Sequence, residues 1–325
     1  MAVPQVAILT NPQSTGNKTH LGKIRKLLDN EQNVFHYELE NVEDISGALS
    51  QFNRTKPSIL IINGGDGTIQ AALTSIINDR PFDVIPPIAV LPSGKTNMIA
   101  ADFGTNGKPN KVLKKLIKIA QCEELDEYLV TKNVIELGRG DGNPPRVGMF
   151  FGGAAMVNVI NYSRNVIHPM GLPNFLSHII AVGAIIISAL TGAKKETSPL
   201  FSHPSYIHLK GGGILKGRFI FIFVTTLDKL ILGARPYGMD GKGGLRFSSI
   251  DHSSKALFRA IKAIIIDNFG SKTIKGVNVR RVDEIRLSGE NSVTLDGEIY
   301  VPNPNSPFIL KGDKTLKFIS LEQKK

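Results

Sequence analysis

The stretch Ile61–Gln70, IINGGDGTIQ, places one carboxylate among several glycines. An apolar run ends there, and apolar residues at helical spacing follow it. Glycine lets the backbone approach a ligand closely or adopt a positive φ angle, and a helix N-terminus attracts phosphate. We therefore predict an anion-binding turn in which Asp66 reaches the anion through Mg²⁺ and Thr68 caps the helix, with a plain strand–turn–helix connection as the alternative. The residues of this turn are Gly64, Gly65, Asp66, Gly67 and Thr68.

Two further loops follow predicted strands. Residues Asn11–Lys18, NPQSTGNK, offer hydroxyls and backbone N–H groups that suit an anion, although ordinary loops share this composition. Residues Pro92–Asn97, PSGKTN, are not a P-loop, because Ala89 stands where that motif needs its first glycine. Lys95 is a candidate phosphate contact as a point charge, and a solvated loop lysine is the alternative.

A turn late in the chain, Thr294–Glu298 or TLDGE, carries two carboxylates. The pair Asp-Gly between two strands is typical of a tight β-turn. Asp296 and Glu298 on one turn also suit general-base chemistry, in which a side chain accepts a proton during the reaction. Spacing alone favours the turn and leaves the catalytic interpretation open.

Short apolar runs alternate with helical patterns in the first third of the chain. This alternation predicts βαβ units, a mainly parallel sheet with helices on both faces, and ligands beyond the carboxyl ends of the strands. After about Asp126, short strand patterns separated by turns predict a β-rich part. We place an α/β domain at residues 1–125 and a β-rich domain at residues 126–325. The predicted strands of the first domain are Val6–Leu9, Val34–Leu39, Ser58–Ile62 and Ile88–Leu91.

The composition limits the partners of this chain. It is 42% hydrophobic and 21% charged, and its formal charge of +11 favours polyanionic partners. Because there is no Trp and no long Lys/Arg run, nucleic acid is not an expected partner. The one cysteine, Cys122, excludes an intramolecular disulfide and fits a reducing, cytoplasmic compartment. The N-terminal residues lack the basic start of a secretory signal.

Three segments bear on membrane contact. Leu172–Leu190 is the longest apolar segment, but its polar interruptions favour a buried helix over a membrane span, with a membrane-dipping helix as the alternative. In two other places, basic residues recur at helical spacing beside apolar ones. That pattern is typical of a helix lying on a membrane, but we favour the alternative, a core-facing helix with a solvated basic face. The basic residues are Lys111, Lys115 and Lys118 in one place, and Lys255, Arg259 and Lys262 in the other.

Taken in order, these loops resemble the diacylglycerol kinase catalytic-domain family, which includes bacterial lipid kinases and the sphingosine and ceramide kinases and is distantly related to the NAD kinases. Gly64–Thr68 match the family's GGDGT signature fully, Asn11–Gly16 match its NPxSG-type loop with one extra residue, and Asp296–Glu298 match its DGE motif. The family's P-x-G-T-x-N-D loop is altered here, because Lys95 replaces Thr and Met98 replaces Asp.

The resemblance implies an α/β nucleotide-binding domain with a mainly parallel sheet, a β-sandwich-like C-terminal domain, and an active site in the cleft between them. It implies a kinase that transfers phosphate from ATP to diacylglycerol or a related lipid. Glu298 would be its general base, with Asp296 as a second catalytic carboxylate, and Asp66 and Asp240 would hold Mg²⁺. The implied ATP-binding residues are Asn11, Ser14, Gly16, Gly64, Gly65, Asp66, Gly67, Thr68, Lys95, Thr96 and Asn97.

Such a kinase is expected to act peripherally on an anionic membrane that holds its lipid substrate, and a homodimer is one candidate assembly. Two alternatives stay open. One is an NAD kinase-like enzyme, which shares the GGDGT loop but phosphorylates a soluble dinucleotide. The other is a non-catalytic nucleotide- or lipid-binding module, which the altered third loop would suit. The late DGE motif and the NPxSG-type loop favour the lipid branch.

Overall fold

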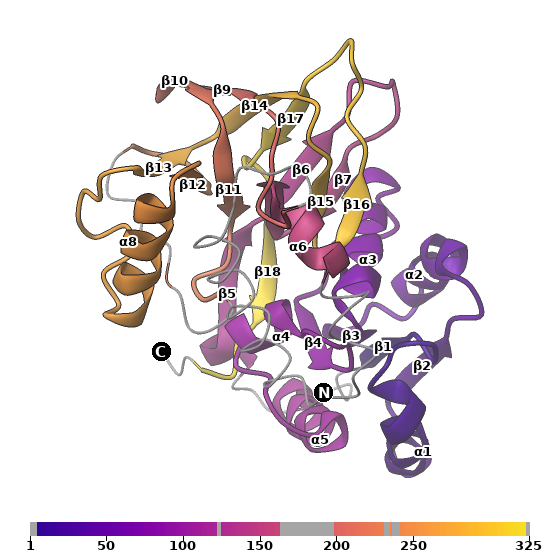
Figure 1. Cartoon of the computed structure of the whole chain (residues 1–325). Helices are drawn as coiled ribbons and strands as arrows, with labels where there is room; N and C mark the ends of the chain where they lie inside the picture. The colour runs from indigo at the N-terminus through magenta and orange to yellow at the C-terminus, as the bar shows by residue number, and fades with distance from the viewer. Residues whose placement is uncertain (1–4, 122–124, 163–197, 231–234, 236–240, 323–325) are drawn as a thin grey trace. The chain divides into compact units, whose positions relative to one another are not determined.

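The structure is a computed structural model of the chain, and it describes residues 5–121, 125–162, 198–230, 235 and 241–322 (Figure 1). The chain forms two compact units. The first contains Met1–Lys132, Arg146–Gly148 and Thr315–Lys325, and the second contains Asn133–Pro145 and Met149–Lys314. The apolar segment at 172–190 and the cysteine at 122 lie outside the described residues. Among the residues that are described, every helix is too short or too polar to cross a membrane.

The first unit is built on a six-stranded sheet with the order β2-β1-β3-β4-β18-β5. The pairs β1–β2, β1–β3, β3–β4 and β4–β18 are all parallel, which confirms the predicted mainly parallel sheet. The strands of this unit are β1 (Val6–Thr10), β2 (Val34–Glu38), β3 (Ile59–Gly64), β4 (Ile88–Pro92), β5 (Leu129–Asn133), β7 (Arg146–Gly148) and β18 (Thr315–Ile319). Its helices are α1 (Asn17–Leu28), α2 (Ile45–Asn53), α3 (Asp66–Asn78), α4 (Met98–Asp102) and α5 (Pro109–Gln121), with the short 3₁₀ turns η1 (Val42–Asp44) and η2 (Leu125–Tyr128).

Both faces of the central strands in this sheet are buried. On one face Ile8 and Ile61 belong to a core that also contains Leu116 of α5 and Ile24 of α1. Successive strand residues point to opposite faces, and the intervening Leu9 is fully buried as well. A parallel sheet covered on both faces needs continuous apolar strands rather than alternating ones. The apolar runs in the sequence therefore predicted these strands correctly.

The second unit consists mainly of antiparallel strands. One sheet contains β10-β9-β14-β17-β6, and the other has the order β13-β12-β11-β8-β15-β16. The strands are β6 (Ile135–Gly138), β8 (Phe150–Ala154), β9 (Ser205–Leu209), β10 (Gly213–Gly217), β11 (Phe219–Thr225), β12 (Leu245–Asp251), β13 (Val277–Val282), β14 (Glu284–Gly289), β15 (Val293–Leu295), β16 (Glu298–Tyr300) and β17 (Phe308–Lys311). The described helices of this unit are α6 (Met156–Tyr162) and α8 (Ser254–Ile265).

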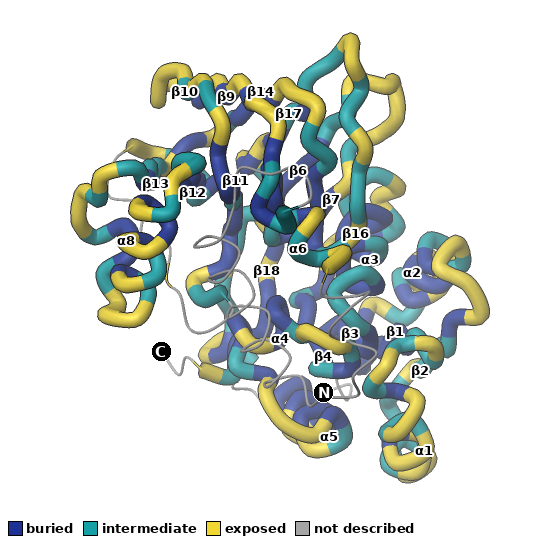
Figure 2. Tube along the Cα trace, in the orientation of Figure 1, coloured by how far each residue is buried: buried dark blue, intermediate teal, exposed yellow. Residues whose placement is uncertain are grey.

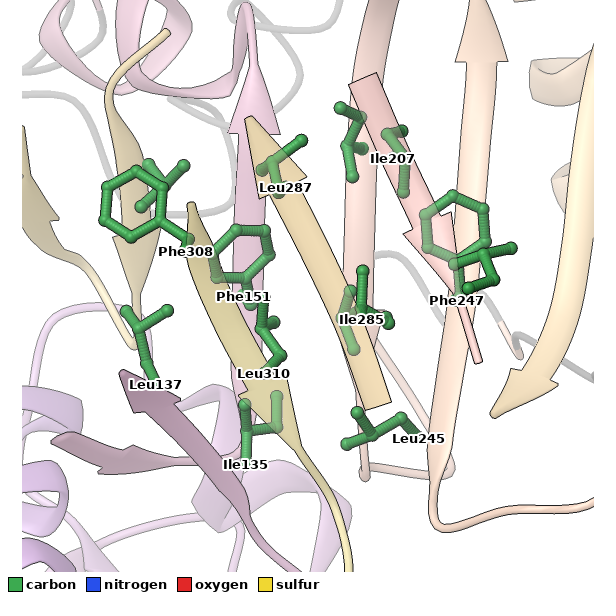
Figure 3. Close-up of a cluster of buried hydrophobic side chains, with 14 of the residues drawn as sticks. Ile135, Leu137, Phe151, Ile207, Leu245, Phe247, Ile285, Leu287, Phe308 and Leu310 are labelled. Carbon is green, nitrogen blue, oxygen red and sulfur yellow. The ribbon is translucent and has the colours of Figure 1, made fainter. Parts of the chain in front are cut away.

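One buried apolar cluster draws residues from both sheets of the second unit (Figure 3). Leu287 and Leu310 come from the first of these sheets, and Phe151 and Phe247 come from the second. On its other face the second sheet carries α8, whose Leu257 packs in a separate cluster with residues of β11 and β12. The second sheet thereby carries α8 on one face and contains the β15–β16 hairpin at its edge.

Candidate functional site

Three loops gather at one edge of the parallel sheet. They are Asn11–Gly16 after β1, Gly64–Thr68 at the end of β3, and Ser93–Asn97 after β4, and we call them together the loop cluster. Because β1 lies beside β3 and β3 beside β4, the carboxyl ends of these parallel strands bring the loops together. Three of the predicted motifs therefore converge, and each supplies residues to one local site.

Glycines allow these loops to touch through their backbones. A Cβ atom added to Gly94 would lie 2.5 Å from Cα of Gly65, and one added to Gly16 would lie 2.9 Å from the carbonyl oxygen of Ser93. Real side chains do not approach backbone so closely, so larger residues would push the loops apart. Gly16, Gly65 and Gly94 all have ordinary negative φ angles. Close approach, and not a positive φ angle, is therefore what requires glycine at these positions.

A buried polar network ties the strand ends below the loop cluster. The side chain of Asn63 is fully buried. Its Nδ2 donates to Oγ1 of Thr10 at 3.1 Å, and its Oδ1 accepts a hydrogen bond from Oγ of Ser93 at 2.6 Å. Nε2 of His36 lies 2.8 Å from the same threonine oxygen. Satisfied buried networks fix one arrangement of the chain, so this network holds the loops in register.

Side chains of the first loop bind the second loop directly. Nδ2 of Asn11 donates to Oγ1 of Thr68 at 2.9 Å, and the backbone N–H of Gly65 donates to Oγ of Ser14 at 3.2 Å. The predicted capping role of Thr68 is wrong, because α3 begins at Asp66 and Gly65 is its N-cap. The hydroxyl of Thr68 accepts a hydrogen bond from another loop instead.

Asn17 is a further member of the site that the sequence did not indicate. Its Nδ2 donates to the backbone oxygens of Asn11, at 2.7 Å, and of Asn63, at 3.2 Å. The residue is buried, yet its Oδ1 has no hydrogen-bond partner among the described residues. Asn17 thus fastens the first loop to the end of β3. An asparagine directly after the glycine of this loop is the sequence signal that could have identified it.

Asp66 holds the third loop in place. Its Oδ1 accepts a hydrogen bond from the backbone N–H of Ile99 at 3.4 Å, at the start of α4. Burial raises the pKa of the Asp66 carboxyl, and hydrogen bonds from the backbone N–H groups of Ile99, Met98 and Asn97 oppose that shift. Within the loop itself, Oδ1 of Asn97 accepts from the N–H of Gly94 at 2.6 Å. The carboxylate therefore already serves a positioning role before any ligand is considered.

The second unit carries the late pair of carboxylates on a two-residue hairpin turn. Leu295 pairs with Glu298, and Asp296 and Gly297 between them have φ angles of 47° and 94°. The predicted Asp-Gly turn is therefore confirmed. The carboxylate of Asp296 is buried and accepts hydrogen bonds from the backbone N–H groups of Met149, at 3.0 Å, and of Phe150, at 2.9 Å. In contrast, Glu298 is exposed.

The first part of the chain matches a known family. Residues 5–126 match the model described as the diacylglycerol kinase catalytic domain. The predicted resemblance is confirmed. A crystal structure of a diacylglycerol kinase from Bacillus anthracis str. Sterne aligns with a TM-score of 0.63 and 16% identity, covering 98% of each chain. Another structure, of a candidate diacylglycerol kinase from the same strain, aligns with a TM-score of 0.65 and 16% identity, covering 99% of each chain. No curated protein matches the sequence.

At this identity the structural neighbours share the fold, and the diacylglycerol kinase match covers the region that contains the loop cluster. Two of its residues depart from the family's loop pattern. Met98, in place of the family's Asp, is buried, so it serves the core at the start of α4. Lys95, in place of the family's Thr, is exposed, as is Thr96. Met98 therefore has a packing role, whereas Lys95 places a cation at the surface of the third loop.

The structure describes one of the two predicted metal ligands. Asp66 is the one carboxylate of the loop cluster. The predicted ligand Asp240 lies outside the described residues. Across the ranges that the structure describes, no group of three or more His, Cys, Asp or Glu side chains is arranged to hold a metal ion. Of the two predicted ligands, Asp66 is therefore the one that lies among the described residues.

Proposed function

We propose that this chain is an ATP-dependent lipid kinase that transfers the γ-phosphate to the hydroxyl of diacylglycerol or a related lipid. The observation that carries this proposal is the contact of Gly65 with Gly94 at the carboxyl ends of β3 and β4. Bare backbone at this edge of a parallel sheet is suited to phosphate groups. The match of residues 5–126 to the diacylglycerol kinase catalytic domain supports the choice of reaction.

The loop cluster fits the phosphates of ATP. A side chain at Gly16, Gly65 or Gly94 would meet backbone or another loop, so the surface there is kept small. The polar side chains of Asn11 and Asn63 are bound to other parts of the site and keep the loops fixed. Donors that are fixed in advance stabilise developing charge without reorganisation, which is the main contribution that proteins make to phosphoryl transfer. Lys95 and Thr96 extend from the third loop to add a charge and a hydroxyl.

Mg²⁺ would neutralise part of the phosphate charge when it is bound. This ion is usually held by one or two carboxylates together with the phosphates of the substrate. Asp66 fits the role of that one protein carboxylate, while also keeping its hydrogen bond to Ile99. Asp240 stays a predicted second ligand. The protein's own part at this site is to hold the third loop against the second, so that nucleotide and cation meet a fixed surface.

Glu298 is proposed as the general base that accepts the proton of the lipid hydroxyl. A base must reach its proton, and an exposed carboxylate on a tight turn meets that requirement. Asp296 is bound by two backbone N–H groups and is proposed as a positioning residue for the turn. Glu298 belongs to the second unit and the loop cluster to the first. The proposal therefore requires both units to act on one pair of substrates.

A mixed-micelle assay with diacylglycerol, ATP and Mg²⁺ tests the proposal. We expect ADP to form only when the lipid is present. A Gly94→Ala variant should lose ATP binding, whereas a Glu298→Gln variant should keep ATP binding and lose turnover. Phosphorylation of NAD⁺ instead of lipid would establish the NAD kinase-like alternative. ATP binding without ADP formation on any lipid acceptor would establish a non-catalytic module.

A diacylglycerol substrate resides in a bilayer, so we also propose that the chain contacts anionic membranes peripherally. The formal charge of +11 favours this attraction. Attraction between a basic surface and anionic lipid weakens as salt screens the charges. Association with anionic vesicles should therefore fall as the salt concentration rises, and association that is indifferent to salt would contradict this part of the proposal.

A further inference from the structure

Helix α8 has an inward face that is fully accounted for by packing. It lies against β11, β12 and β13 of the second unit, and its small and apolar residues enter a buried cluster with Ile220 and Ile250. The inward residues are Ala256, Leu257, Ala260 and Ala263. They recur at three- and four-residue intervals, as one face of a helix requires. Ile261 and Ile264 are half-buried and pack against the same cluster, so only the exposed positions of α8 are available for another role.

Part of α8 is exposed (Figure 2). This outward face mixes cations with large apolar side chains. Phe258 is 37% exposed, Ile265 is 77% exposed, and Ile266, which follows directly, is 55% exposed. The cations Lys255, Arg259 and Lys262 are exposed as well. The six positions are separated by three, one, three, three and one residues, which places them on one side of the helix. A helix that only covers a core would present polar residues there.

Helix α5 shows what an ordinary basic helix of this protein looks like. Its large apolar residues, such as Leu113 and Leu116, are all buried. Its exposed cations are Lys111, Lys114, Lys115 and Lys118. The two helices share the same alternation of basic and apolar residues in the sequence. Only α8 exposes apolar side chains among its cations, so a solvated basic face does not explain it.

The cations of the outward face have no ion-pair partner in the part of the chain that the structure describes. Across the described residues, no carboxylate lies within ion-pair distance of Lys255, Arg259 or Lys262. Arg259 donates to the backbone oxygen of Lys275 at 3.3 Å, which adds another exposed cation beside the helix. Asp267, the acid at the end of α8, is 3.9 Å from a cation, Arg235. The face therefore carries an excess of positive charge.

We propose that the outward face of α8 docks on an anionic lipid surface. Ile265, Ile266 and Phe258 would enter the boundary between headgroups and acyl chains, and the cations would meet lipid phosphates. Interfacial helices bind in this way, with apolar area and charge adding to each other. Charge selects this occupant, because an apolar protein surface would supply no anion to the three cations. The inference extends the proposed lipid kinase function, but docking itself needs neither ATP nor catalysis.

Flotation of the full chain with vesicles tests the docking. The vesicles contain equal parts of phosphatidylglycerol and phosphatidylcholine, and no nucleotide is added. Replacing both isoleucines, Ile265→Ser with Ile266→Ser, should weaken binding by at least about tenfold, because two exposed apolar side chains no longer enter the lipid. Replacing two cations, Lys255→Gln with Lys262→Gln, should weaken binding by about tenfold or more. All these positions are exposed, so both variants should unfold at the wild-type temperature.

The matched control is the double variant Lys111→Gln with Lys118→Gln on α5. It removes the same charge from a helix without exposed apolar residues, so binding should stay within about twofold of wild type. Equal losses for the α5 and α8 cation variants would show a diffuse effect of net charge and overturn the proposal. Wild-type binding by the isoleucine variant would overturn it as well. So would a concentration-dependent dimer that the isoleucine variant abolishes, because a second copy would then cover the face. A failure of the kinase assay would leave these outcomes unaffected.

Discussion

The loop cluster of the first unit and the Asp296–Glu298 turn of the second unit differ in what their polar side chains bond to. In the loop cluster and at the strand end below it, several polar side chains bond to another segment: Asn63 binds Ser93, Asn11 binds Thr68, and Asp66 binds the start of α4. Beside them, the loops offer a ligand the backbone of their glycines and the exposed side chains of Lys95 and Thr96. In the turn, one carboxylate is buried against backbone N–H groups and the other is exposed.

This difference distinguishes the polar groups that hold the site in place from the groups that are left to contact a substrate. Buried polar groups must be satisfied, and a satisfied group is held in one place. Asp296 and Asn63 therefore resemble each other in role, although one is a carboxylate and the other an amide. The groups that we propose act on substrates are the glycine backbone, Asp66, Lys95 and Thr96 in the first unit. In the second unit the proposed group is the carboxylate of Glu298.

The largest effect should come from Glu298→Gln. If Glu298 accepts the proton of the lipid hydroxyl, its amide variant should lower kcat by roughly a hundred- to ten-thousandfold. ATP affinity should not change, because the loop cluster is untouched. The measurement is initial-rate kinetics with diacylglycerol micelles, beside ATP binding by calorimetry. The control is Glu290→Gln, another exposed carboxylate of the same unit, which should keep full activity. Equal kcat values for the two variants would remove Glu298 from the mechanism.

The next effect concerns the buried carboxylate of the same turn. Asp296→Ala leaves two backbone N–H groups without their acceptor and places alanine at a φ angle of 47°. We expect the free energy of unfolding to fall by about 3 kcal/mol. Asp296→Asn keeps one acceptor oxygen and should cost about 1 kcal/mol. Chemical denaturation measures both. If neither variant is destabilised, the positioning role of Asp296 is wrong.

In the first unit the equivalent test is Gly94→Ala. The new methyl group would lie 2.5 Å from Cα of Gly65, so the second and third loops must separate. We expect a loss of about 2 kcal/mol in stability from overpacking. Since a displacement of about 1 Å can cost roughly a hundredfold in a precise site, ATP binding should weaken far more than this stability loss indicates.

The control for that variant is Gly47→Ala in α2. A methyl group at Gly47 would meet nothing within 4 Å. Alanine in an exposed helix position is more stable than glycine by about 0.5–1 kcal/mol. The control should therefore unfold slightly later than wild type and bind ATP normally. ATP binding that survives in Gly94→Ala would mean that contact between the loops is not what forms the site.

Much of the first unit could be predicted from the sequence, for a physical reason. Continuous apolar runs such as Ile59–Ile62 belong to strands buried on both faces, and such strands place their loops at one edge of a parallel sheet. The meeting of the GGDGT loop with the other two loops followed from that rule. The Asp-Gly turn was also predictable, because two positive φ angles are needed and these residues tolerate them.

The remaining features depend on contacts that sequence spacing does not determine. Asn63 ends an apolar strand, and only the fold reveals that its amide reaches both Thr10 and Ser93. Thr68 has a suitable residue type for a cap, but the helix begins two residues earlier. Helices α5 and α8 have similar sequence patterns, and their exposed faces differ because each packs on a different sheet. Whether an isoleucine is buried or exposed is decided by the partner surface.

The smallest effect should be a pH dependence at the base of the loop cluster. Burial lowers the pKa of His36 below its ordinary value of 6.5, and Arg25 adds to this shift, whereas the carboxylate of Glu38 opposes it. Since Thr10 already accepts from Asn63, its hydroxyl can donate to an unprotonated Nε2 of His36, and protonation would reverse that bond. The folded state therefore binds this proton less readily than the unfolded state.

With a lowered folded pKa, the contribution of His36 to stability is complete above 6.5 and is lost as the pH falls through the folded pKa. Wild type should thus lose more stability than His36→Gln between about pH 7.5 and pH 5, because glutamine does not titrate there. Denaturation curves at a series of pH values measure the difference. ATP affinity should follow the same trend, since the network that His36 touches ends at Ser93 in the third loop. If the free energy of unfolding varies with pH in the same way for both proteins, the network below the loops stays intact when His36 is charged. The glycine contacts above that network would then matter more for the loop cluster than the network does.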